Sequence, residues 1–504
     1  MAELPLISRA RVHGDRLCIL EGDATFTYDD LLSASAKVAA ALLGARHDLE
    51  ETRVGFLVPP GFEHVAVQWG IWRAGGIAVP LGVSHPEPEL QYTIEDADAA
   101  VVVVHPDHDN AQTRLLDPRD RRLLVTRDAL ACEPRDLPEV AETRRAMIVY
   151  TSGTTGRPKG VVTTHENLKA QVTSLVTAWE WTAGDRILLT LPLHHVHGIV
   201  NVLACALWSG AQCDVLARFD AEDVWDRIAG GGLTLFMAVP TIYRKLITAW
   251  EAAPEDRQRT MSAACAELRL MVSGSAALPV SIFERWRKIS RHTLLERYGM
   301  TEIGMGLSNP LRGERVPGSV GAALPGVEIR LVDSDGATAA PGQAGEIEVR
   351  GPGVFLEYWR RPEETRKAFH DGWFRTGDIG VLSEERYSLV GRQSVDIINT
   401  GGFNVSALEI EEVLRTHPAI EECAVVGMPD RDLGERVCAA VELQAGHELS
   451  LETLRAWAKQ HLAPYKIPRE LCPAELPRNA MGKIMKQHVS TMFQPGDDDG
   501  DMDS

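Results

Sequence analysis

The most informative segment of the chain lies between residues 150 and 160 and reads Tyr150-Thr151-Ser152-Gly153-Thr154-Thr155-Gly156-Arg157-Pro158-Lys159-Gly160. Glycines in such a segment let backbone N–H groups approach phosphate oxygens, the hydroxyls can donate hydrogen bonds to them, and the two cations offset their charge. The segment does not fit the Walker pattern G-x-x-x-x-G-K-S/T. A polar turn after an apolar strand is the alternative, but the density of these residue types favours a loop that binds nucleotide phosphates.

Three shorter motifs further along the chain supply other groups that a bound nucleotide needs. The first, Arg297-Tyr298-Gly299-Met300-Thr301-Glu302, combines an aromatic ring, a hydroxyl and a carboxylate, which suit base stacking, a phosphate contact and a metal ion. In the second, Asp378 follows a glycine turn, where a carboxylate can accept from both ribose hydroxyls. The third places Lys483 in a polar turn, where a lysine is ordinarily solvated. Each motif alone favours a structural role, but together the four segments indicate a nucleotide-handling protein without a Walker loop.

Length and composition limit the remaining possibilities. A chain of 504 residues is too long for one ordinary core and predicts at least two domains. The 52 basic residues against 71 acidic ones give a net charge of -19, which argues against a binder of nucleic acid or of an anionic membrane. No apolar run approaches the roughly 18 residues of a membrane-spanning helix. The eight cysteines are scattered without a C-x-x-C pair, which is typical of a reducing compartment, and the first residues lack the pattern of a secretory signal. We therefore expect a cytoplasmic enzyme.

The texture of the chain predicts its domain organisation. Short apolar runs such as 54–58 and 268–272 alternate with helical patterns such as 31–43, which predicts an α/β architecture. From residue 316 the pattern changes to alternating strands separated by Gly and Pro, which predicts a smaller β-rich subdomain. After residue 391 the pattern changes again and predicts a mixture of helices and strands. We predict an N-terminal domain over 1–391, a C-terminal domain over 392–490, and an acidic disordered tail over 491–504.

The four motifs, in this order and spacing, resemble those of the adenylate-forming enzymes, the group of acyl-CoA synthetases, peptide-synthetase adenylation domains and luciferases. The resemblance runs from Thr25 to Lys483 and covers nearly the whole chain. It implies a large N-terminal ATP- and acyl-binding domain with mixed sheets, helices and the β-rich subdomain, followed by a small mobile α+β lid. It also implies ATP, Mg²⁺ and coenzyme A as the small molecules that the enzyme uses.

The resemblance assigns roles to individual residues. Segment 151–160 would hold the β- and γ-phosphates, Tyr298 would stack on adenine, and Asp378 with Arg392 would bind ribose. The residues expected around ATP are Thr151, Ser152, Gly153, Thr154, Thr155, Gly156, Lys159, Tyr298, Gly299, Thr301, Asp378 and Arg392. Catalytic roles fall to Lys483, Thr301, Glu302 and His197, with Glu302 as the metal ligand and Lys483 as the cation that meets the attacking carboxylate and the α-phosphate. Gln393 and Ser394 would form the hinge, and Gly401, Gly402 and Ser406 would line the path of CoA. Many relatives carry Lys where this chain has Asn399, and a basic residue where it has Asn404.

The acyl pocket should be built by residues 193–198, 237–243 and 273–279. The histidines of 193–198 invite a metal interpretation, but no carboxylate or cysteine at ligand spacing joins them. Arg297 is the informative residue, because an unpaired arginine facing a fatty-acid tunnel would be costly to bury, whereas a second substrate carboxylate would pair with it. An ion pair with Glu296 or Glu302 is the alternative for this arginine. The residues expected to contact the acyl group are Arg297, His197, Ser275, Ser273, Gly274 and Met300.

We therefore predict a ligase for a short dicarboxylic acid, and the acyl-pocket strings closely resemble those of malonyl-CoA synthetases. Malonate would be joined to CoA through malonyl-adenylate, with methylmalonate as a second substrate, since one methyl group changes binding by only about 1–3 kcal/mol. Three alternatives stay open: a medium-chain or aryl acyl-CoA synthetase, an adenylation protein that loads a carrier-protein thiol, and a scaffold that keeps only the fold. The sequence leaves open whether the protein is a monomer or a homodimer.

Overall fold

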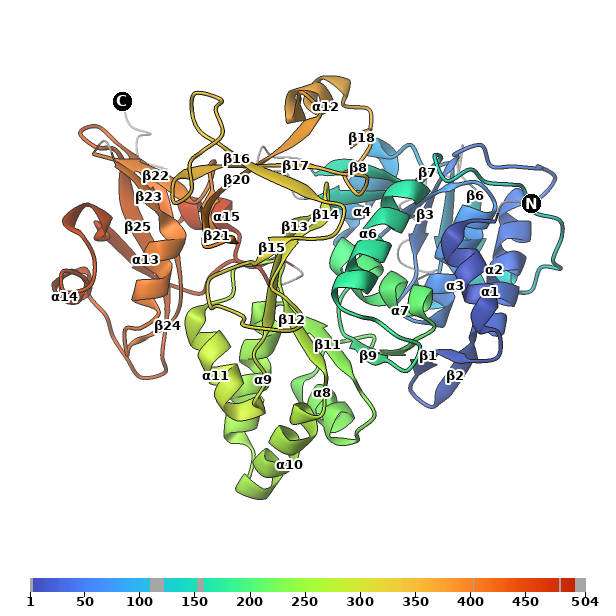
Figure 1. Ribbon diagram of the computed structural model, residues 1–504, viewed down its shortest axis with the longest axis horizontal. Coiled ribbons are helices and arrows are strands. Elements are labelled where there is room, and N and C mark those ends of the chain that lie inside the picture. The colour runs from blue at the N-terminus through green and yellow to red at the C-terminus, as the bar shows by residue number, and fades with distance from the viewer. Residues whose placement is uncertain (1–2, 109–121, 152–157, 402, 480–481, 495–504) are drawn as a thin grey trace, which may run out of the picture.

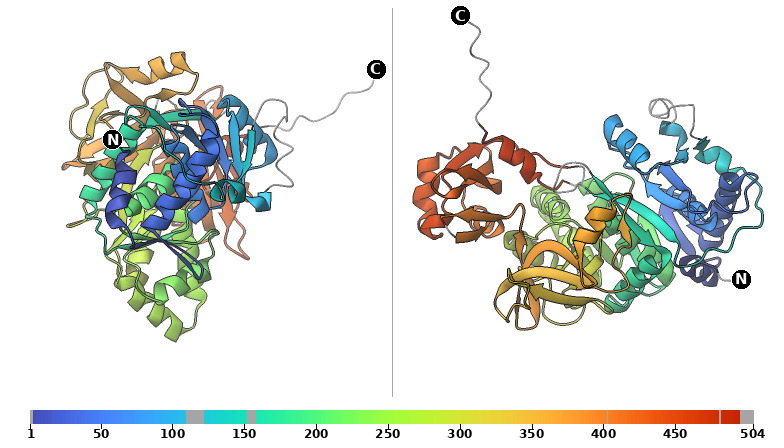
Figure 2. Two further views of the ribbon diagram at one scale, coloured as in Figure 1. Left: turned by 90° about the vertical axis from the view of Figure 1, so that its right-hand side faces the viewer. Right: turned by 90° about the horizontal axis from the view of Figure 1, so that it is seen from above.

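The protein consists of a large N-terminal body and a smaller C-terminal body, as seen in a computed structural model that describes residues 3–108, 122–151, 158–401, 403–479 and 482–494. The two bodies lie side by side, with the C-terminal body at one end of the molecule and the first helices of the chain at the other (Figures 1 and 2). Strands from β13 to β20 lie between the two ends, and they carry the predicted nucleotide motifs around residues 298 and 378 (Figure 1).

Two mixed sheets form the framework of the large body. The seven-stranded sheet has the order β18-β8-β7-β4-β3-β5-β6, from β18 (Glu357–Tyr358), β8 (Lys159–Thr164), β7 (Arg145–Thr151), β4 (Ile77–Pro80), β3 (Arg53–Leu57), β5 (Val101–Val104) and β6 (Arg122–Val125). The nine-stranded sheet has the order β15-β14-β13-β12-β11-β9-β10-β1-β2, from β15 (Ala322–Ala323), β14 (Gly304–Ser308), β13 (Leu295–Met300), β12 (Leu270–Ser273), β11 (Leu235–Ala238), β9 (Arg186–Leu189), β10 (Gln212–Val215), β1 (Leu17–Glu21) and β2 (Ala24–Thr27). The central strands of both sheets are parallel and buried, as continuous apolar runs predict.

The helices of the large body pack against these sheets, and most of them share one continuous apolar core with the strands (Figure 1). They are α1 (Pro5–His13), α2 (Tyr28–Leu43), α3 (Phe62–Arg73), α4 (Glu87–Asp96), α5 (Thr126–Leu130), α6 (His165–Ala178), a π-helix (His197–Ala204), α7 (Cys205–Ser209), α8 (Ala221–Ala229), α9 (Pro240–Ala252), α10 (Glu255–Ala266), α11 (Val280–Ser290) and α12 (Pro362–Ala368). Local sequence starts two of them with capping boxes, in which Thr27 pairs with Asp30 and Thr164 pairs with Asn167.

A third, antiparallel sheet forms the β-rich subdomain that the change of texture predicts. Its strands are β16 (Glu328–Val332), β17 (Ala344–Arg350), β19 (Phe369–His370), β20 (Trp373–Ser383) and β21 (Arg386–Arg392). The inward side chains, among them Ile347 and Phe374, pack on Tyr298 and Ile303 of the large body. This core fixes β20 and β21 beside β13, and it therefore brings the motif around residue 378 next to the motif around residue 298.

The C-terminal body, called the lid below, is an α+β unit with its own cores. Its sheet contains β22 (Ile397–Thr400), β23 (Phe403–Ser406), β24 (Ile420–Asp430), β25 (Gly434–Leu443) and β26 (Glu470–Pro473), and its helices are α13 (Ala407–Leu414), α14 (Leu451–Ala458) and α15 (Lys486–Thr491). α13 and α14 pack on one face of the sheet, and α15 packs on the other.

The observed boundaries refine the predicted ones. β21 keeps Arg392 in the sheet of the large body, paired with Asp378, so the chain leaves that body just after the predicted boundary of 391. At the other end, Thr491 closes α15 and Phe493 is buried in the lid core, so the packed lid extends beyond residue 490. The rest of the predicted tail, residues 495–504, lies outside the described residues.

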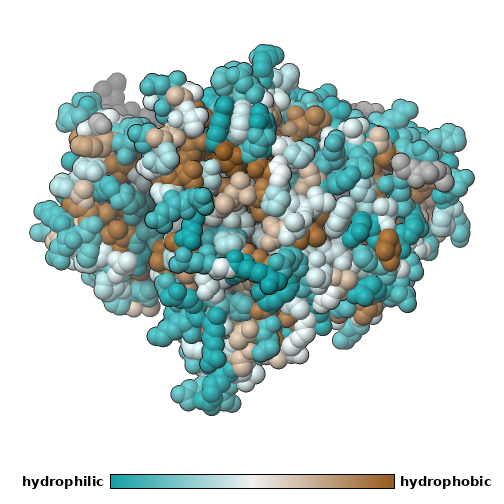
Figure 3. Space-filling model, viewed as in Figure 1, coloured by the Kyte–Doolittle hydropathy of each residue, from teal (hydrophilic) through white to brown (hydrophobic). Residues whose placement is uncertain are grey.

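Polar residues cover much of the visible surface, as the charged composition of the chain predicts (Figure 3). On the face shown in Figure 3, hydrophilic residues predominate and hydrophobic residues form separate patches. Within the described part of the chain, no helix combines the length and the apolar character that crossing a membrane requires.

Candidate active site

Three strands, β7, β12 and β13, each carry a predicted site segment at or just beyond the carboxyl end. Thr151 is the last residue of β7 and lies opposite Lys159, the first residue of β8. The phosphate-loop residues between them, Ser152, Gly153, Thr154, Thr155 and Gly156, lie outside the described residues. The register of β7 and β8 nevertheless places the entry and exit of the predicted loop side by side.

Lys159 forms an ion pair with Glu364 at the N-terminal part of α12. Its ammonium also lies 5.3 Å from the centre of the Tyr358 ring. The Tyr358 hydroxyl in turn donates to Glu302 Oε1 over 2.9 Å. The predicted phosphate-binding lysine and the predicted metal ligand are therefore linked through one tyrosine, which no sequence motif singles out.

The predicted ribose-binding group is fully assembled. Arg392 Nε donates to Asp378 Oδ1 over 2.8 Å, and the Tyr298 hydroxyl donates to Asp378 Oδ2 over 2.7 Å. Burial lowers the pKa of Arg392, but the Asp378 carboxylate outweighs this effect and leaves that pKa above its ordinary value. Gly377 takes a φ of +73° at the turn before Asp378, a conformation that favours glycine.

The metal-binding prediction rests on Glu302, which is buried at the turn between β13 and β14. Burial raises the pKa of its carboxyl group. A single carboxylate fits Mg²⁺, which usually keeps several waters and is held by one or two carboxylates together with substrate phosphates. Among the described residues, no three His, Cys, Asp or Glu side chains are grouped as a metal site would require, and this includes the histidines of segment 193–198.

The other residues of this motif have mainly packing roles in the structure. At Gly299 an added Cβ would lie 2.1 Å from the carbonyl oxygen of Gly304, so glycine is required for β13 and β14 to approach. Met300 is half-buried against the core of the β-rich subdomain, which is where the structure places this predicted acyl contact. Thr301 is half-buried beside Glu302.

Lys483 lies on the lid and faces the ribose-binding group. Although its side chain reaches water, protein surrounds it on most sides. Burial lowers its pKa and the charge of Arg392 lowers it further, while Asp396 and Asp378 act in the opposite direction. The backbone N–H of Lys483 donates to Asn479 Oδ1 over 3.0 Å, which holds the turn that carries it. The predicted catalytic lysine and the predicted ribose ligands are therefore brought together.

At the acyl end, three predicted residues form a hydrogen-bonded group. Arg297 Nη2 donates to Ser275 Oγ over 3.4 Å, and Ser275 Oγ lies 3.1 Å from His197 Nδ1. Arg297 is 3% exposed and His197 is 2% exposed. Within the described part of the chain, Arg297 forms no ion pair, the carboxyl of Glu296 acts on it only from a distance, and its Nε lacks a hydrogen-bond partner. The ion pair with Glu296 or Glu302 that the sequence left open is therefore absent from these residues.

Electrostatics follow from this burial. Burial lowers the pKa of Arg297 to about 9, and burial together with the charge of Arg297 lowers the pKa of His197 well below its ordinary value. The imidazole of His197 is therefore neutral at pH 7, whereas the guanidinium keeps its charge. The result is a buried positive charge whose immediate neighbours are neutral.

The loop of residues 273–279 is shaped by this arginine. An added Cβ at Gly274 would lie 2.5 Å from Cζ of Arg297, so glycine lets the guanidinium lie against the loop. Ser275 takes a φ of +70°, which is uncommon for serine and turns its hydroxyl group between Arg297 and His197. Ser273 is fully buried, and its hydroxyl has no partner among the described groups.

Glu296 is a group whose state the sequence did not reveal. Its side chain is 5% exposed; Oε1 accepts from the backbone N–H of Leu278 over 3.1 Å, and Oε2 has no partner among the described residues. Burial raises the pKa of this carboxyl to about 8. Sequence reasoning considered Glu296 as a partner of Arg297, but neighbouring residues of a strand point to opposite faces. No local signal predicts a buried acid here.

The predicted hinge and CoA segment lie on the lid side of the site. Gln393 and Ser394 are exposed between β21 and β22. Gly401 takes a φ of +59° in the β22–β23 turn, and Gly402 lies outside the described residues. Ser406 caps α13 by accepting from Glu409 N over 3.2 Å, and its hydroxyl donates to the carbonyl oxygen of Val390 over 2.5 Å. The structure thus uses Ser406 structurally, and its contact with CoA stays a prediction.

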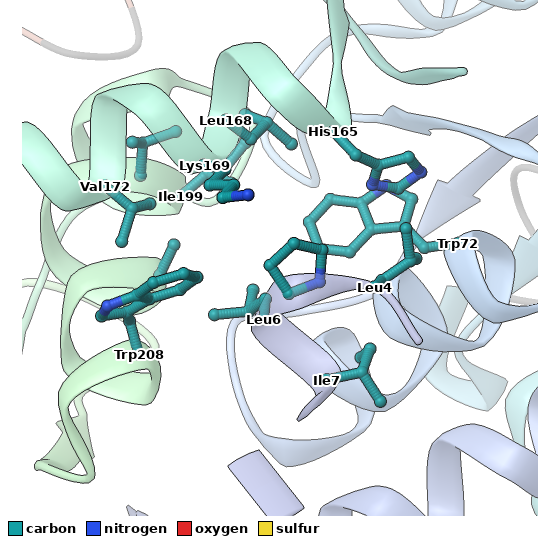
Figure 4. Close-up of a pocket in the computed structure, with 13 residues that line it drawn as sticks. Leu4, Leu6, Ile7, Trp72, His165, Leu168, Lys169, Val172, Ile199 and Trp208 are labelled. Carbon is teal, nitrogen blue, oxygen red and sulfur yellow. The ribbon is translucent and has the colours of Figure 1, made fainter. Parts of the chain in front are cut away.

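A small apolar cavity of about 30 Å³ lies elsewhere, beneath α1 (Figure 4). Trp72 and Trp208 approach it from opposite sides, and Leu6 and Ile199 also line it. Ile199 belongs to the π-helix that begins with His197, so the cavity lies behind the acyl end. None of the predicted site residues lines it.

Comparison with known proteins identifies relatives over nearly the whole chain. A mitochondrial malonate–CoA ligase of Xenopus laevis is 46% identical over an alignment that covers 98% of this chain and 92% of the relative. ATP-bound MatB from Rhodopseudomonas palustris superposes with a TM-score of 0.89 at 33% identity, covering 98% of this chain and 99% of that one. The apo form of MatB gives a TM-score of 0.78 at the same identity and coverage. This chain therefore superposes more closely on the ATP-bound form than on the apo form.

Family sequence models match both bodies. The model described as AMP-binding enzyme matches residues 6–359, and the model described as AMP-binding enzyme C-terminal domain matches residues 409–483. The first match includes the phosphate loop, Arg297 and Glu302, and the second ends on Lys483. With the fold, the ordered ribose-binding group and these matches in agreement, the chain belongs to the AMP-binding enzyme family of adenylate-forming enzymes.

Proposed function

We propose that this protein is an AMP-forming malonate–CoA ligase. A carboxylate oxygen of malonate attacks the α-phosphorus of ATP, the bond to the β-phosphate oxygen breaks, and pyrophosphate leaves malonyl-adenylate behind. The CoA thiol then attacks the activated carbonyl carbon, loses its proton, and displaces AMP. Malonate–CoA ligase activity is also what the name of the Xenopus laevis relative states for that protein.

The observation that carries the choice of acid is the buried, unpaired charge of Arg297. A guanidinium removed from water without a carboxylate partner is costly, and the cost falls when an anion binds to it. A fatty or aromatic acid offers only the carboxylate that reacts with ATP, whereas a short dicarboxylic acid offers a second one. The second carboxylate of malonate would form charge-assisted hydrogen bonds with Arg297.

The neighbours of Arg297 can complete this anion site. Because Ser275 Oγ accepts from Arg297, its own proton can be donated to His197 Nδ1. The neutral His197 then keeps its proton on Nε2, which has no partner among the described residues and can donate to a bound carboxylate. Asp378, Arg392 and Tyr298 would position the nucleotide at the opposite end of the site.

Lys483 supplies positive charge at the reacting atoms, where a carboxylate must approach a polyanion. Thr301 and the segment of residues 151–160 would contact the phosphates. Glu302 would hold Mg²⁺, which stabilises negative charge on the phosphates when it is bound with ATP. The roles of these residues, and of Gly401, Gly402 and Ser406 toward CoA, are part of the proposal.

A substrate screen by pyrophosphate release tests this function. We expect the highest kcat/KM with malonate, a lower value with methylmalonate, and little activity with acetate, succinate, octanoate or benzoate. Substitution of Arg297→Ala should lower kcat/KM for malonate by about 10²–10³-fold, the usual effect of removing one partner of a buried charge pair. The same variant should retain its KM for ATP, because Arg297 does not contact the ribose-binding group.

The control is the thermal stability of the variant. Removing an unpaired buried charge should leave the melting temperature unchanged or higher, so a loss of activity would not reflect unfolding. Unchanged malonate kinetics in Arg297→Ala would contradict the assignment of the acid while leaving the ligase class intact. Comparing CoA with a carrier-protein thiol as acceptor separates the ligase from the protein-loading alternative.

The cytoplasmic location stays a prediction from the sequence. Cell fractionation with an antibody against the native protein tests it.

A further inference from the structure

The lid contacts two helices of the large body, α9 and α11. Glu412 of α13 accepts a hydrogen bond from the backbone N–H of Val280, the first residue of α11, over 3.2 Å. Arg244 of α9 forms an ion pair with Glu421 of the lid over 3.4 Å. These contacts place the lid against the lower helices of the large body, as Figure 1 shows.

Glu412 accepts a hydrogen bond from an N–H group at the start of α11 that no local side chain caps. The first N–H groups of a helix have no partner within the helix and carry a partial positive charge. α11 begins after Pro279, which has no side-chain cap, and its first turn contains no acidic residue. A carboxylate from the other body of the protein therefore performs the capping that Ser, Thr, Asp or Asn usually performs locally.

α11 is the direct continuation of the loop that carries the acyl site. Arg297 packs on Gly274 at the start of this loop, and Glu296 accepts from Leu278 near its end. Glu412 binds the next N–H group along the chain, that of Val280, because Pro279 has none. The loop is thus held by the large body at two points and by the lid at the third.

The lid itself aims Glu412 at this place. Arg415, one turn later on α13, donates to Glu412 Oε1 over 2.9 Å, while Oε2 is the atom that meets Val280. Arg415 also binds Glu422 over 2.8 Å and lies 3.4 Å from Glu411, so its own charge stays compensated without Glu412. The lid therefore holds the carboxylate of Glu412 in position. That carboxylate is not needed to neutralise the charge of Arg415.

We propose that Glu412 is a positioning residue for adenylate formation: it caps α11 only when the lid stands in the present orientation, and it thereby links lid closure to the order of the acyl loop. The inference rests on the proposed function, in which Lys483 must approach ATP from the lid. A rotation about Gln393 and Ser394 that withdraws Lys483 moves α13 as well and breaks the bond to Val280. Formation of the thioester from a supplied adenylate does not require this contact.

The experiment measures the two half-reactions separately in the full-length protein. Glu412→Ala should lower malonate-dependent ATP–pyrophosphate exchange by about two- to thirtyfold, the range that the loss of a helix cap produces. The rate of malonyl-CoA formation from supplied malonyl-adenylate and CoA should change less than twofold. Glu412→Gln, which keeps an acceptor but loses the charge, should lie between Glu412→Ala and the native protein.

A second variant removes the other partner of the same bond. Val280→Pro deletes the N–H donor at the first helical position, where proline is well tolerated, and Pro279 already has the extended conformation that a following proline prefers. We expect it to slow pyrophosphate exchange like Glu412→Ala, and the double variant to be no slower than either single one. Glu452→Ala, at the exposed first turn of α14, is the matched control and should behave like the native protein.

Two results would overturn the inference. One is native pyrophosphate exchange in both Glu412→Ala and Val280→Pro; the other is equal slowing of both half-reactions in Glu412→Ala. Lack of malonate-dependent exchange in the native protein would instead contradict the proposed function. If Val280→Pro has a lower melting temperature, Glu412→Gln against Glu412→Ala still decides between the outcomes.

Discussion

The two ends of the site hold an arginine in opposite ways. At the ribose end, Arg392 is bound to Asp378, which also accepts from Tyr298, so these two charges are paired before a nucleotide arrives. At the acyl end, Arg297 is more deeply buried, and its one hydrogen bond to a described residue goes to the hydroxyl of Ser275. Every ATP molecule carries the same ribose, so a preformed group can bind it. The acid, by contrast, must be selected from other carboxylic acids.

The difference between a paired and an unpaired arginine bears on substrate specificity. A paired charge contributes geometry and costs little, because its desolvation is already compensated. An unpaired buried charge makes the empty site less stable, and the right substrate recovers that stability on binding. On the proposed function, the acyl end would discriminate by the chemical nature of the missing partner, and the ribose end by shape.

After Arg297→Ala, the largest expected effect comes from breaking the ribose end. Asp378→Ala leaves Arg392 without its carboxylate and Tyr298 without its acceptor, so we expect the KM for ATP to rise by about 10–100-fold. Stability should fall by about 1–3 kcal/mol, measured by chemical denaturation. The KM for malonate should change little, in contrast to Arg297→Ala. Similar effects of both variants on both substrates would remove the distinction between the two ends.

A smaller effect tests the second uncompensated group of the acyl end, Glu296. Burial raises its pKa from the ordinary value near 4.5 to about 8, so the native state holds a proton that the unfolded chain releases between these values. The stability of the native protein should therefore fall as pH rises from 5 to 8. Glu296→Gln stays neutral and should be more stable than the native protein at pH 8 by about 1–4 kcal/mol, with little difference at pH 5.

Denaturation curves at the two pH values measure this effect. Glu284→Gln, an exposed position on α11, is the control and should show no such dependence on pH. A gain for Glu296→Gln that is equal at pH 5 and pH 8 would mean that the native carboxyl does not titrate in this range.

The smallest expected effect concerns Lys159, whose charge is paired at the surface of the phosphate site. Glu364 must release Lys159 before the lysine can bind the phosphates of ATP. Because this pair is partly exposed, Glu364→Gln should lower the KM for ATP by only about two- to fivefold, with kcat unchanged. Binding of AMP, which lacks the β- and γ-phosphates, should not change.

Glu363→Gln is the matched control for this substitution. Glu363 lies next to Glu364 on α12 but pairs with Arg366 in solvent, so the same change of charge should leave the KM for ATP as it is. If both variants lower this KM equally, a general change in surface charge explains the effect and the pair with Lys159 does not.

Local structure followed from the sequence wherever the signal was local. The apolar runs at 54–58 and 268–272 correspond to β3 and β12, the helical pattern at 31–43 to α2, and the change of texture after 316 to the antiparallel sheet. The motifs around residues 298, 378 and 483 were predicted to meet, and the structure brings them together. Hydrophobic period and turn residues encode these features within a few positions.

Contacts between distant segments had no such signal. Tyr358, Glu364 and Glu412 contact predicted site residues or their loop from segments that carry no recognisable motif. The sequence also left two explanations for Arg297, a structural ion pair and a substrate contact, because it does not show which side chains share a buried space.

The sequence by itself determined the chemical inventory of this protein: the phosphate loop, the ribose carboxylate, the mobile lysine and an arginine beside the tyrosine of the nucleotide motif. Only the tertiary structure decided which of these charges are paired and which are not. The physical reason is that the type of a side chain is fixed by its codon, whereas its desolvation and its partners depend on every segment that packs around it.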